Sequence, residues 1–587
     1  MSNSAPDEQK SGQMGPEKVP DNHIENRATS PVKLVRLDSY KDDTHVDLTW
    51  RSWMVVFVTC FAIMAQVFVV VAAGSVIGFI IRDLGDASIA GWIIQGPLLM
   101  QSVLSPIVGR LSDILDRKHL AFFPPLLAFA GAVISAKATS MTMLIGGGIL
   151  IGTTLSTISI VQAIPSEVLP LKYRALANGF AFMGGAIGGL VGSLGAGAAT
   201  NASTSGWRNI FWIQAAFHMI TALGIYAFYW PPKKSSDAPK LRWSSVVWDC
   251  DPIGSLLFIT SATLMLLALN WAGGSYHWSD THVIANLTIG LVIFVAFCLY
   301  EWKGRDDGLV AHVFFKNNWN FPLSVFAFAV EGWIFYSAVN SVTPLVVLHL
   351  GFEENAWRIS IRQLAYTLTT LVASVPITLY ATWRKDLKMP LLITFTLFLV
   401  VTICYCTITP SMNRAQIGFN VLSGLGQSGP LTLLVALVQF TAPNAYLSTA
   451  TGLAFSARAL GGAYGSAVLD SIINGKLASS YAPAVSKAAT NAGLPASSIA
   501  ALLTALAAGS AEAINEVPGM DTMIMAASLR ASELTYAHAY RLAWASIIPF
   551  VVLALFAVAA LKGVRELMTE HVEATVEVIE PRDKTVV

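Results

Sequence analysis

The stretch "GRLSDILDRK", residues 109–118, places five charged side chains of both signs between two long apolar runs, 89–109 and 120–138. As helices, runs of about 20 residues cross the roughly 30 Å hydrocarbon core of a bilayer. Gly109 permits a tight turn. Asp113 is suited to pair with an Arg or to face the positive N-terminal end of another helix. The stretch predicts a charged turn between two membrane spans. The alternative is a solvated loop that merely follows the positive-inside rule.

The composition indicates a membrane protein, and we expect no cofactor. Of the 587 residues, 54% are hydrophobic and 12% are charged, whereas soluble domains carry roughly 25% charged residues. The net charge of +1 argues against a nucleic-acid partner, which needs a concentrated positive field. No disulfide framework is readable in the five cysteines. We find no metal-ligand cluster, P-loop or nucleophile motif, so we expect neither an enzyme nor an ATP-driven pump.

Apolar runs of spanning length predict about fourteen membrane helices. They cover 53–80, 89–109, 120–138, 141–164, 175–199, 208–230, 253–271, 283–302, 321–350, 361–381, 389–409, 415–441, 449–473 and 541–562. The polar segment 1–52 reads as a disordered cytosolic tail, and 563–587 as a second tail.

The runs fall into groups. Six lie within 53–230, two within 253–302 and six within 303–562, with a cytosolic loop at 231–252 and a partly helical extracellular loop at 475–540. Lys and Arg concentrate in alternate loops, which predicts that both termini are cytosolic. The sequon at Asn201 then lies outside, where glycosylation is chemically allowed, although a chance match is the alternative.

The spacing within the opening stretch resembles the signature loop of the major facilitator superfamily. The matching residues are Gly109, Leu111, Asp113, Arg117 and Lys118, whereas Asp116 replaces the second glycine of the signature. The resemblance implies that Asp113 latches the two halves of a rocking transporter near the start of the thirteenth span, around Ser448.

A glycine series in the fifth span resembles the antiporter motif of the same superfamily. Glycines stand at the motif positions Gly179, Gly188, Gly192 and Gly197, whereas Ser193 and Ala196 depart from it. Close backbone packing would seal a leak path, which favours export; generic packing of small residues between helices is the alternative.

Two ionisable side chains are predicted at membrane depth. Glu331 and Arg458 each lie about ten residues, hence about 15 Å, into a span, where charged groups are costly and mark function. We hypothesise that they pair and that protonation of Glu331 releases the pair; a static packing pair is the alternative. Drug exporters of the major facilitator superfamily resemble each other in an Arg within the fourth span. The predicted fourth span of this chain, 141–164, contains no basic residue.

Other polar and aromatic residues near mid-depth are candidates for a substrate cavity. These are Gln66, Trp92, Gln101, His218, Trp333, Tyr336 and Gln427. The alternative for the Gln and His side chains is hydrogen bonding to neighbouring helices.

Several separated segments, including "SEVLPLKYRALANGF", "GWRNIFWI" and "DCDPIGSLLF", look like the fungal trichothecene efflux pump family, in the fourteen-helix drug:proton antiporter branch. The resemblance implies an all-α integral membrane protein of the major facilitator fold, with two six-helix bundles and two inserted helices. It also implies a plasma-membrane exporter of a hydrophobic, trichothecene-like sesquiterpenoid in exchange for protons, by alternating access. We expect a monomer in the bilayer. The alternatives are ferric-siderophore uptake, a non-transporting receptor, and a vacuolar or vesicle membrane.

Overall fold

The computed structural model describes residues 50–85, 89, 92–115, 117–203, 205–230, 243–272, 276–316, 319–353, 356–508 and 511–569. These residues belong to one compact unit, and their regular secondary structure is helical. Asp116, both predicted tails except for a few residues, and most of the loop 231–252 lie outside the described residues.

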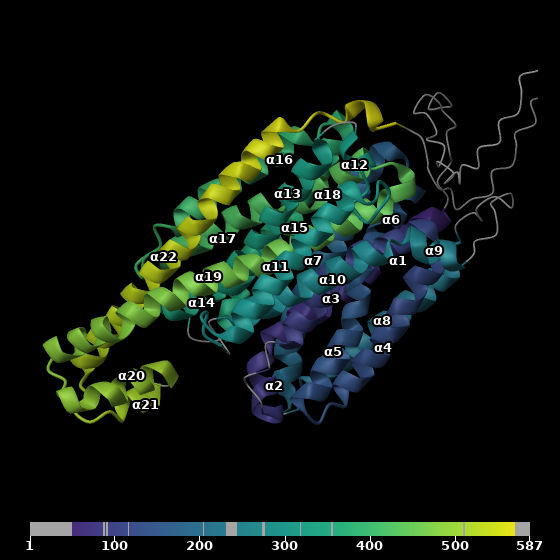
Figure 1. Ribbon diagram of the computed structural model, residues 1–587. Helices are drawn as coiled ribbons and strands as arrows, with labels where there is room; N and C mark the ends of the chain where they lie inside the picture. Colours follow the sequence, from purple (N-terminus) through teal and green to yellow (C-terminus); the bar gives the residue numbers. More distant parts are fainter. Residues whose placement is uncertain are drawn as a thin grey trace, which may run out of the picture. The chain divides into compact units, whose positions relative to one another are not determined.

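The first eight α-helices, of which α2 is short, form an N-terminal group (Figure 1). Its elements are α1 (Trp50–Ser75), α2 (Ile77–Leu84), α3 (Trp92–Ile114), α4 (Arg117–Ala136), α5 (Met141–Ser156), α6 (Ile158–Val168), the 3₁₀ turn η2 (Leu171–Tyr173), α7 (Arg174–Ala202) and α8 (Arg208–Phe228). Helix α1 packs on α7 and α8, and α5 packs on α3 and α4. Because these helices are apolar on most sides, each can face both its neighbours and lipid.

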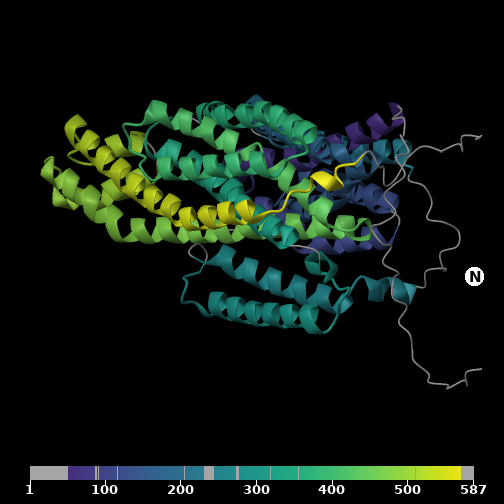
Figure 2. The same ribbon diagram turned by 90° about the horizontal axis from the view of Figure 1, so that it is seen from above.

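A helical hairpin follows, which we call the inserted hairpin. It consists of α10 (Pro252–Trp271) and α11 (Thr281–Lys303), preceded by the short α9 (Trp243–Asp249). Asp251 starts α10 by accepting a hydrogen bond from the Gly254 N–H, with Pro252 at the first helical position, both of which favour a helix start. In Figure 2 the two teal helices of the inserted hairpin lie at one side of the other helices.

The remaining helices form a C-terminal group. They are α12 (Val313–Lys316), α13 (Asn320–Gly332), the π-helix η3 (Trp333–Val342), α14 (Thr343–His349), α15 (Ala356–Arg384), α16 (Lys388–Tyr405), α17 (Asn413–Gln427), α18 (Pro430–Thr441), the 3₁₀ turn η4 (Asn444–Tyr446), α19 (Leu447–Asn491), η5 (Ala496–Ser498), α20 (Ile499–Ala508), α21 (Ala511–Asn515), α22 (Thr522–Ala560) and η6 (Arg565–Leu567). The predicted span 321–350 is thus one continuous run through α13, η3 and α14, whose middle is wound as a π-helix.

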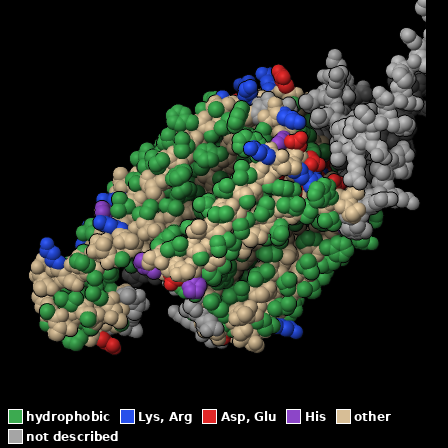
Figure 3. All heavy atoms as spheres, in the orientation of Figure 1, with side chains coloured by type: hydrophobic (Ala, Val, Ile, Leu, Met, Phe, Trp, Pro, Cys, Tyr) green, Lys and Arg blue, Asp and Glu red, His purple; other side chains and the backbone are tan. Residues whose placement is uncertain are grey.

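Within the described residues, twelve helices are long and apolar enough to cross a membrane. The two other predicted spans, 89–109 and 449–473, overlap α3 and α19, which are not among these twelve helices. Large apolar side chains such as Val372 and Phe556 are 69% exposed. Figure 3 shows apolar side chains covering the visible face of the helices, with charged ones gathered near α12. This distribution suits helices whose outer faces contact lipid.

The segment 475–540 is more helical than the sequence indicates. Helix α19 continues to Asn491 and α22 already begins at Thr522, so both project past the predicted spans (Figure 1). The short α20 and α21 pack between them around a separate apolar cluster that includes Leu502 and Val517. The helices extend into this partly helical segment from both borders because the Ala-rich flanks have high helix propensity.

The N-terminal and C-terminal groups meet along two seams. At the first seam α3 packs on α19, and at the second seam α7 packs on α15 and α18. Asp113 lies at the end of α3, beside the start of α19. We call this end of the helices the Asp113 end. It also holds α12, whose Phe314 ring packs on Tyr446 just before α19.

Candidate functional site

The Asp113 carboxylate caps the start of α19 across the first seam. Its Oδ1 accepts the Ser448 N–H at 3.1 Å, and its Oδ2 accepts the Thr449 N–H and hydroxyl, both at 2.7 Å. These N–H groups are among the four that a helix start leaves without partners inside the helix. The side chain of Asp113 is 1% exposed. A buried negative charge thus meets the positive end of a helix from the other group.

Arg117 extends this contact to a second acid. Its Nη2 lies 2.7 Å from Asp113 Oδ1, and its Nη1 pairs with the Glu167 carboxylate at the end of α6. The Lys118 ammonium lies instead over the Trp230 ring, 2.8 Å from its centroid. Leu111 is half-buried on α3. The signature residues therefore join α3, α4, α6 and α19 at the Asp113 end.

Close backbone contact holds the first seam together beside this cap. A Cβ on Gly109 would lie 2.4 Å from Ser448 O, and one on Gly452 would lie 2.4 Å from Ser105 O. The Ser456 hydroxyl donates to Ser102 O at 2.6 Å. Glycine is required at both positions because any side chain would push α3 and α19 apart.

Gln439, at the end of α18, is a central residue of the second seam that the sequence analysis missed. Its Oε1 accepts the Ser166 hydroxyl and the Asn178 Nδ2–H, each at 2.8 Å. Arg174 Nη1 donates to Gln439 O at 2.8 Å. The Gln439 side chain is fully buried, so one amide ties α6 and α7 to the C-terminal group.

An internal repeat is the signal that identifies Gln439. The segments "PLKYRALANG", residues 170–179, and "PNAYLSTATG", residues 443–452, share Pro, Tyr, Ala and Gly at equal spacing. Each contains a 3₁₀ turn followed by a long helix, α7 or α19. The offset of 273 residues makes Gln439 the counterpart of Ser166, its own hydrogen-bond partner. Such repeats mark the two halves of many transporters.

Arg110 joins the inserted hairpin to the first seam. Its Nε donates to Asp249 O at 3.0 Å and its Nη2 to Asp307 O at 2.9 Å, so it binds the chain on both sides of α10 and α11. Its guanidinium also lies 4.7 Å from the centroid of the Tyr446 ring. Arg110 is 5% exposed, and it therefore contacts parts of all three helix groups.

Two buried acids, Asp251 and Glu301, bind the chain that follows the inserted hairpin, at the end of the hairpin that Arg110 contacts. The Leu309 N–H reaches both Asp251 Oδ2 and Glu301 Oε1 at 3.2 Å, and the Val310 N–H donates to Glu301 Oε2 at 2.9 Å. Burial raises the pKa of Asp251, but its hydrogen bonds with Glu301, Gly254 and Leu309 outweigh burial and lower the pKa. Two carboxyls this close share one proton more readily than they ionise together.

The second charged cluster lies inside the C-terminal group. Arg458 on α19 donates through Nε to Glu331 Oε2 at 2.5 Å and through Nη2 to Oε1 at 3.0 Å. Gln427 Nε2 donates to the same carboxylate, and Arg458 Nη1 donates to the Tyr336 hydroxyl at 2.8 Å. The guanidinium also packs on the Phe335 ring. Glu331 is completely buried and Arg458 is 5% exposed, so the two residues form a bidentate ion pair.

The predicted cavity residues divide between the two helix groups. Gln66 donates from α1 to Thr154 O at 2.8 Å, and His218 on α8 bonds to Gln214; Gln101 is buried on α3 and Trp92 is partly buried at its start. Trp333, Tyr336 and Gln427 belong to the neighbourhood of Glu331 in the C-terminal group. Gln427 is therefore a partner of the ion pair.

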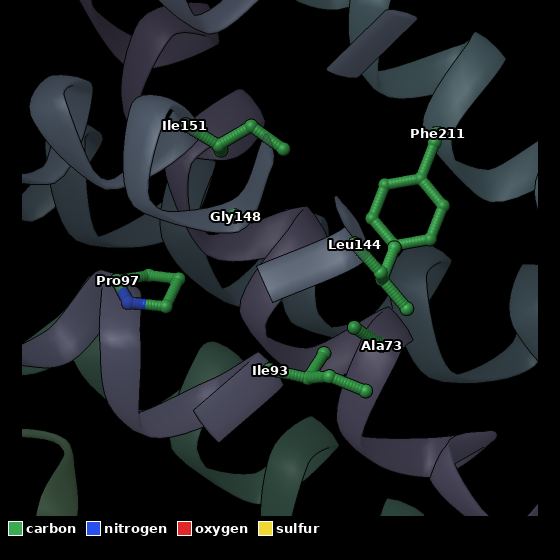
Figure 4. Close-up of a pocket in the computed structure, with 7 residues that line it drawn as sticks. All are labelled: Ala73, Ile93, Pro97, Leu144, Gly148, Ile151 and Phe211. Carbon is green, nitrogen blue, oxygen red and sulfur yellow. The ribbon is translucent and has the colours of Figure 1, made fainter. Parts of the chain in front are cut away.

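A small apolar cavity lies within the N-terminal group. It is lined by Ala73, Ile93, Pro97, Leu144, Gly148, Ile151 and Phe211, from α1, α3, α5 and α8 (Figure 4). Its volume is about 10 Å³, room for about one water molecule, which is far below the roughly 300–1,000 Å³ of ligand pockets. The predicted cavity residues are not among the seven that line it.

The glycines of α7 serve two different contacts. Cβ atoms on Gly188 and Gly192 would lie 2.3 Å from Met64 O and 2.8 Å from Phe68 O of α1, and Gly184 faces Cys60 O in the same way. Gly179 instead faces Thr378 of α15, across the second seam, and Gly197 faces the Trp357 ring at 3.5 Å. Asn201 lies in the last turn of α7, with its side chain outside the described part of the structure.

The sequence of the chain is similar to those of known membrane transporters. The Major Facilitator Superfamily profile matches residues 55–466. The MFS-type transporter opaD of Aspergillus ustus is 26% identical over 446 residues, 73% of this chain and 72% of its own length. The trichothecene efflux pump TRI12 of Fusarium sporotrichioides is 24% identical over 527 residues, 87% of this chain and 86% of its own. The solved proton:xylose symporter XylE bound to 6-bromo-6-deoxy-D-glucose aligns over 71% of this chain and 87% of its own, at 13% identity and a TM-score of 0.49.

The superfamily match covers most of the chain and includes the Asp113 cap, both seams and the Glu331–Arg458 pair. The chain therefore belongs to the Major Facilitator Superfamily.

Proposed function

We propose that this transporter exports a hydrophobic organic compound, of the trichothecene-like sesquiterpenoid class, in exchange for protons across the plasma membrane. The Asp113 end is its cytosolic side, and both termini lie there. The excess of Lys and Arg in the loops at this end supports the orientation. The efflux pumps among its relatives support the direction of transport.

The buried Glu331–Arg458 pair is the observation that carries the proposal. Glu331 is completely buried in a membrane helix, and the two Arg458 contacts and the Gln427 amide satisfy its carboxylate oxygens. Protonation of Glu331 removes one charge of the pair and so frees the guanidinium. Arg458 can then rest on the Tyr336 hydroxyl and the aromatic faces that already surround it.

The same neighbourhood suits an oxygenated, mostly apolar substrate. Trp333 packs its ring on Phe550, while its Nε1–H has no hydrogen-bond partner among the described residues. The Gln427 Oε1 likewise has no hydrogen-bond partner among the described residues. A sesquiterpenoid carries hydroxyl and ether or ester oxygens on an apolar skeleton, which matches one donor and one acceptor beside aromatic rings.

The test separates proton coupling from substrate binding in proteoliposomes that contain the full chain. We expect wild type to transport a radiolabelled trichothecene when a pH gradient is imposed. The Glu331→Gln variant should lose at least about tenfold of this gradient-driven transport, since its side chain no longer titrates. It should retain exchange of labelled for unlabelled substrate without a gradient.

Two controls keep the result interpretable. Glu331→Gln leaves Arg458 buried without a counter-charge, which can destabilise the fold, so the double variant Glu331→Gln/Arg458→Gln is measured beside it. Glu516→Gln changes an exposed acid and should behave as wild type. Gradient-driven transport by Glu331→Gln at the wild-type rate would remove its coupling role. Transport of a ferric siderophore in place of the trichothecene would replace the proposed cargo.

A further inference from the structure

The chain that follows α22 crosses the Asp113 end of the C-terminal group. We call residues 561–569 the C-terminal strap. It starts with a reciprocal pair of hydrogen bonds, in which Asn320 Nδ2 donates to Lys562 O at 3.0 Å and the Lys562 N–H donates to Asn320 Oδ1 at 2.8 Å. Leu561, Val564 and Met568 are buried against the core of that group. The strap is therefore a packed part of the fold.

Two consecutive carbonyls of the strap bind opposite sides of the second seam. Met568 O accepts the Lys385 ammonium at 2.7 Å, from the turn after α15. Thr569 O accepts the Lys172 N–H at 2.8 Å, from the turn before α7. Because α15 and α7 belong to different helix groups, the strap bridges them directly.

The internal repeat shows what is unusual about this seam. With the offset of 273 residues, Asp386 is the counterpart of Asp113, and Thr378 is the counterpart of Ser105. The glycine contacts obey the repeat, since Gly452 faces Ser105 at the first seam and Gly179 faces Thr378 at the second. The hydrogen bonds of Asp386 do not follow the repeat. Asp386 Oδ1 accepts the Lys388 and Met389 N–H groups and so caps its own helix, α16.

The second seam thus lacks, among the described residues, the carboxylate cap that closes the first. The strap lies beside the start of α7, where the Thr569 carbonyl accepts the N–H of Lys172, two residues before that helix begins. Both kinds of oxygen accept hydrogen bonds from the other helix group, and both contacts must break if the groups separate at this end.

We propose that the C-terminal strap is a latch that holds the cytosolic side closed at the second seam and releases Lys172 whenever that side opens. The proposal rests on the proposed transport cycle, in which the cytosolic side must open and close. It assigns a conformational role to the last described residues of the chain, outside the residues matched by the superfamily profile.

The experiment measures distances between spin labels on either side of the second seam. The labels replace Trp53 on α1 and Trp383 on α15, which are 45% and 78% exposed, in the chain with its five cysteines changed to serine. A chain that stops after Leu567 lacks both bridging carbonyls, whereas one that stops after Val572 keeps them. We expect the first to raise the ratio of long to short distances about tenfold and the second to leave it unchanged.

A point variant tests the same bridge without shortening the chain. Lys385→Met removes the bond to Met568 O and should raise the ratio several-fold, while Lys388→Met removes an equal charge three residues further on and should not. If the shortened chain fails to fold, the comparison of Lys385→Met with Lys388→Met tests the latch instead. Equal distance distributions in all variants, with wild type alternating on substrate addition, would overturn the latch and leave the transport cycle intact. A wild-type chain that never samples the long distance, beside a shortened chain that does, would support the latch and contradict the cycle.

Discussion

A single carboxylate links the two helix groups at the first seam. Asp113 accepts three hydrogen bonds from the first turn of α19, two of them from N–H groups that no residue within the helix can satisfy. Its charge is balanced by Arg117 and its side chain is almost completely buried. A charge in this position stabilises the contact between the two groups only while α19 stays beside it.

Loss of this cap should open the first seam. We expect Asp113→Ala to lower the ratio of closed to open protein about tenfold, since helix caps contribute about 0.5–2 kcal/mol. Asp113→Asn should have a smaller effect because its amide oxygen still accepts one N–H. The measurement is the labelling rate of a cysteine placed at Ser105, which is fully buried at this seam and whose hydroxyl has no partner among the described residues. A membrane-impermeant maleimide is added from the cytosolic side.

Asp386→Ala is the matched control, because Asp386 is the repeat counterpart of Asp113 but caps α16. Its variant should leave the labelling of the cysteine at position 105 unchanged. Equal acceleration in both variants would indicate general loosening of the helices and contradict a specific role for the cap.

The residues that the sequence identified best were those with a charge that needs a partner. Asp113, Glu331 and Arg458 stood out because a charge at the bilayer edge or within it is costly alone, and the structure gives each a partner. Uncharged polar residues carry no such signal. Gln427 is a candidate both for a cavity and for a hydrogen bond to a neighbouring helix, and the structure shows that its amide donates to Glu331. Gln439, which joins the second seam, carries no signal in the sequence apart from the internal repeat.

At the scale of the element, the glycines of α7 fix how closely it packs on α1. Gly184, Gly188 and Gly192 recur every four residues, so all three lie on one face of the helix and meet Cys60 O, Met64 O and Phe68 O in turn. The backbones of α1 and α7 therefore come close at these three glycines. This packing belongs to the N-terminal group alone and crosses neither seam.

A side chain at Gly188 should separate these helices. We expect Gly188→Val to destabilise the protein by about 1–3 kcal/mol, because its Cβ would lie 2.3 Å from Met64 O and backbone cannot move aside as a side chain can. Thermal unfolding in detergent, followed by intrinsic fluorescence, measures the effect. Gly195→Val is the control in the same helix, since no described neighbour lies within 4 Å of its added Cβ. A Tm of Gly188→Val equal to that of Gly195→Val would disprove the packing role.

Element positions were predictable where apolar runs ended at charges or prolines. Each of the fourteen runs overlaps a helix of the described structure, and twelve helices have the length and hydropathy of a membrane span. Length and hydrophobicity are the properties that a bilayer requires of a spanning helix. Their ends were less predictable. The π-helix at 333–342 and the helical flanks of 475–540 depend on tertiary contacts and on alanine content, which hydropathy does not report.

At the scale of the whole molecule, the two halves repeat each other while their seams are closed differently. The first seam has the Asp113 cap and is also covered by the inserted hairpin, where Phe258, Phe297 and Leu309 pack near Ile107 of α3 and Leu460 of α19. The second seam has the Gln439 network and the C-terminal strap. The inserted hairpin and the C-terminal strap, which have no counterpart in the repeat, thus lie at the first and the second seam of the two halves.

The inserted hairpin should therefore influence opening through Arg110, whose side chain binds both of its ends and the Tyr446 ring. Arg110→Gln removes the cation that lies over the Tyr446 ring. The shorter side chain keeps at most one of the two hydrogen bonds to Asp249 O and Asp307 O. We expect faster cytosolic labelling of the cysteine at position 105, by about tenfold, since a hydrogen bond from a charged group contributes about 1.5–3 kcal/mol. Lys303→Gln, an exposed charge at the same end of the hairpin, should leave the rate unchanged. If Arg110→Gln instead labels at the wild-type rate, the hairpin merely rests against the first seam, and closure there depends on Asp113 and the glycine contacts alone.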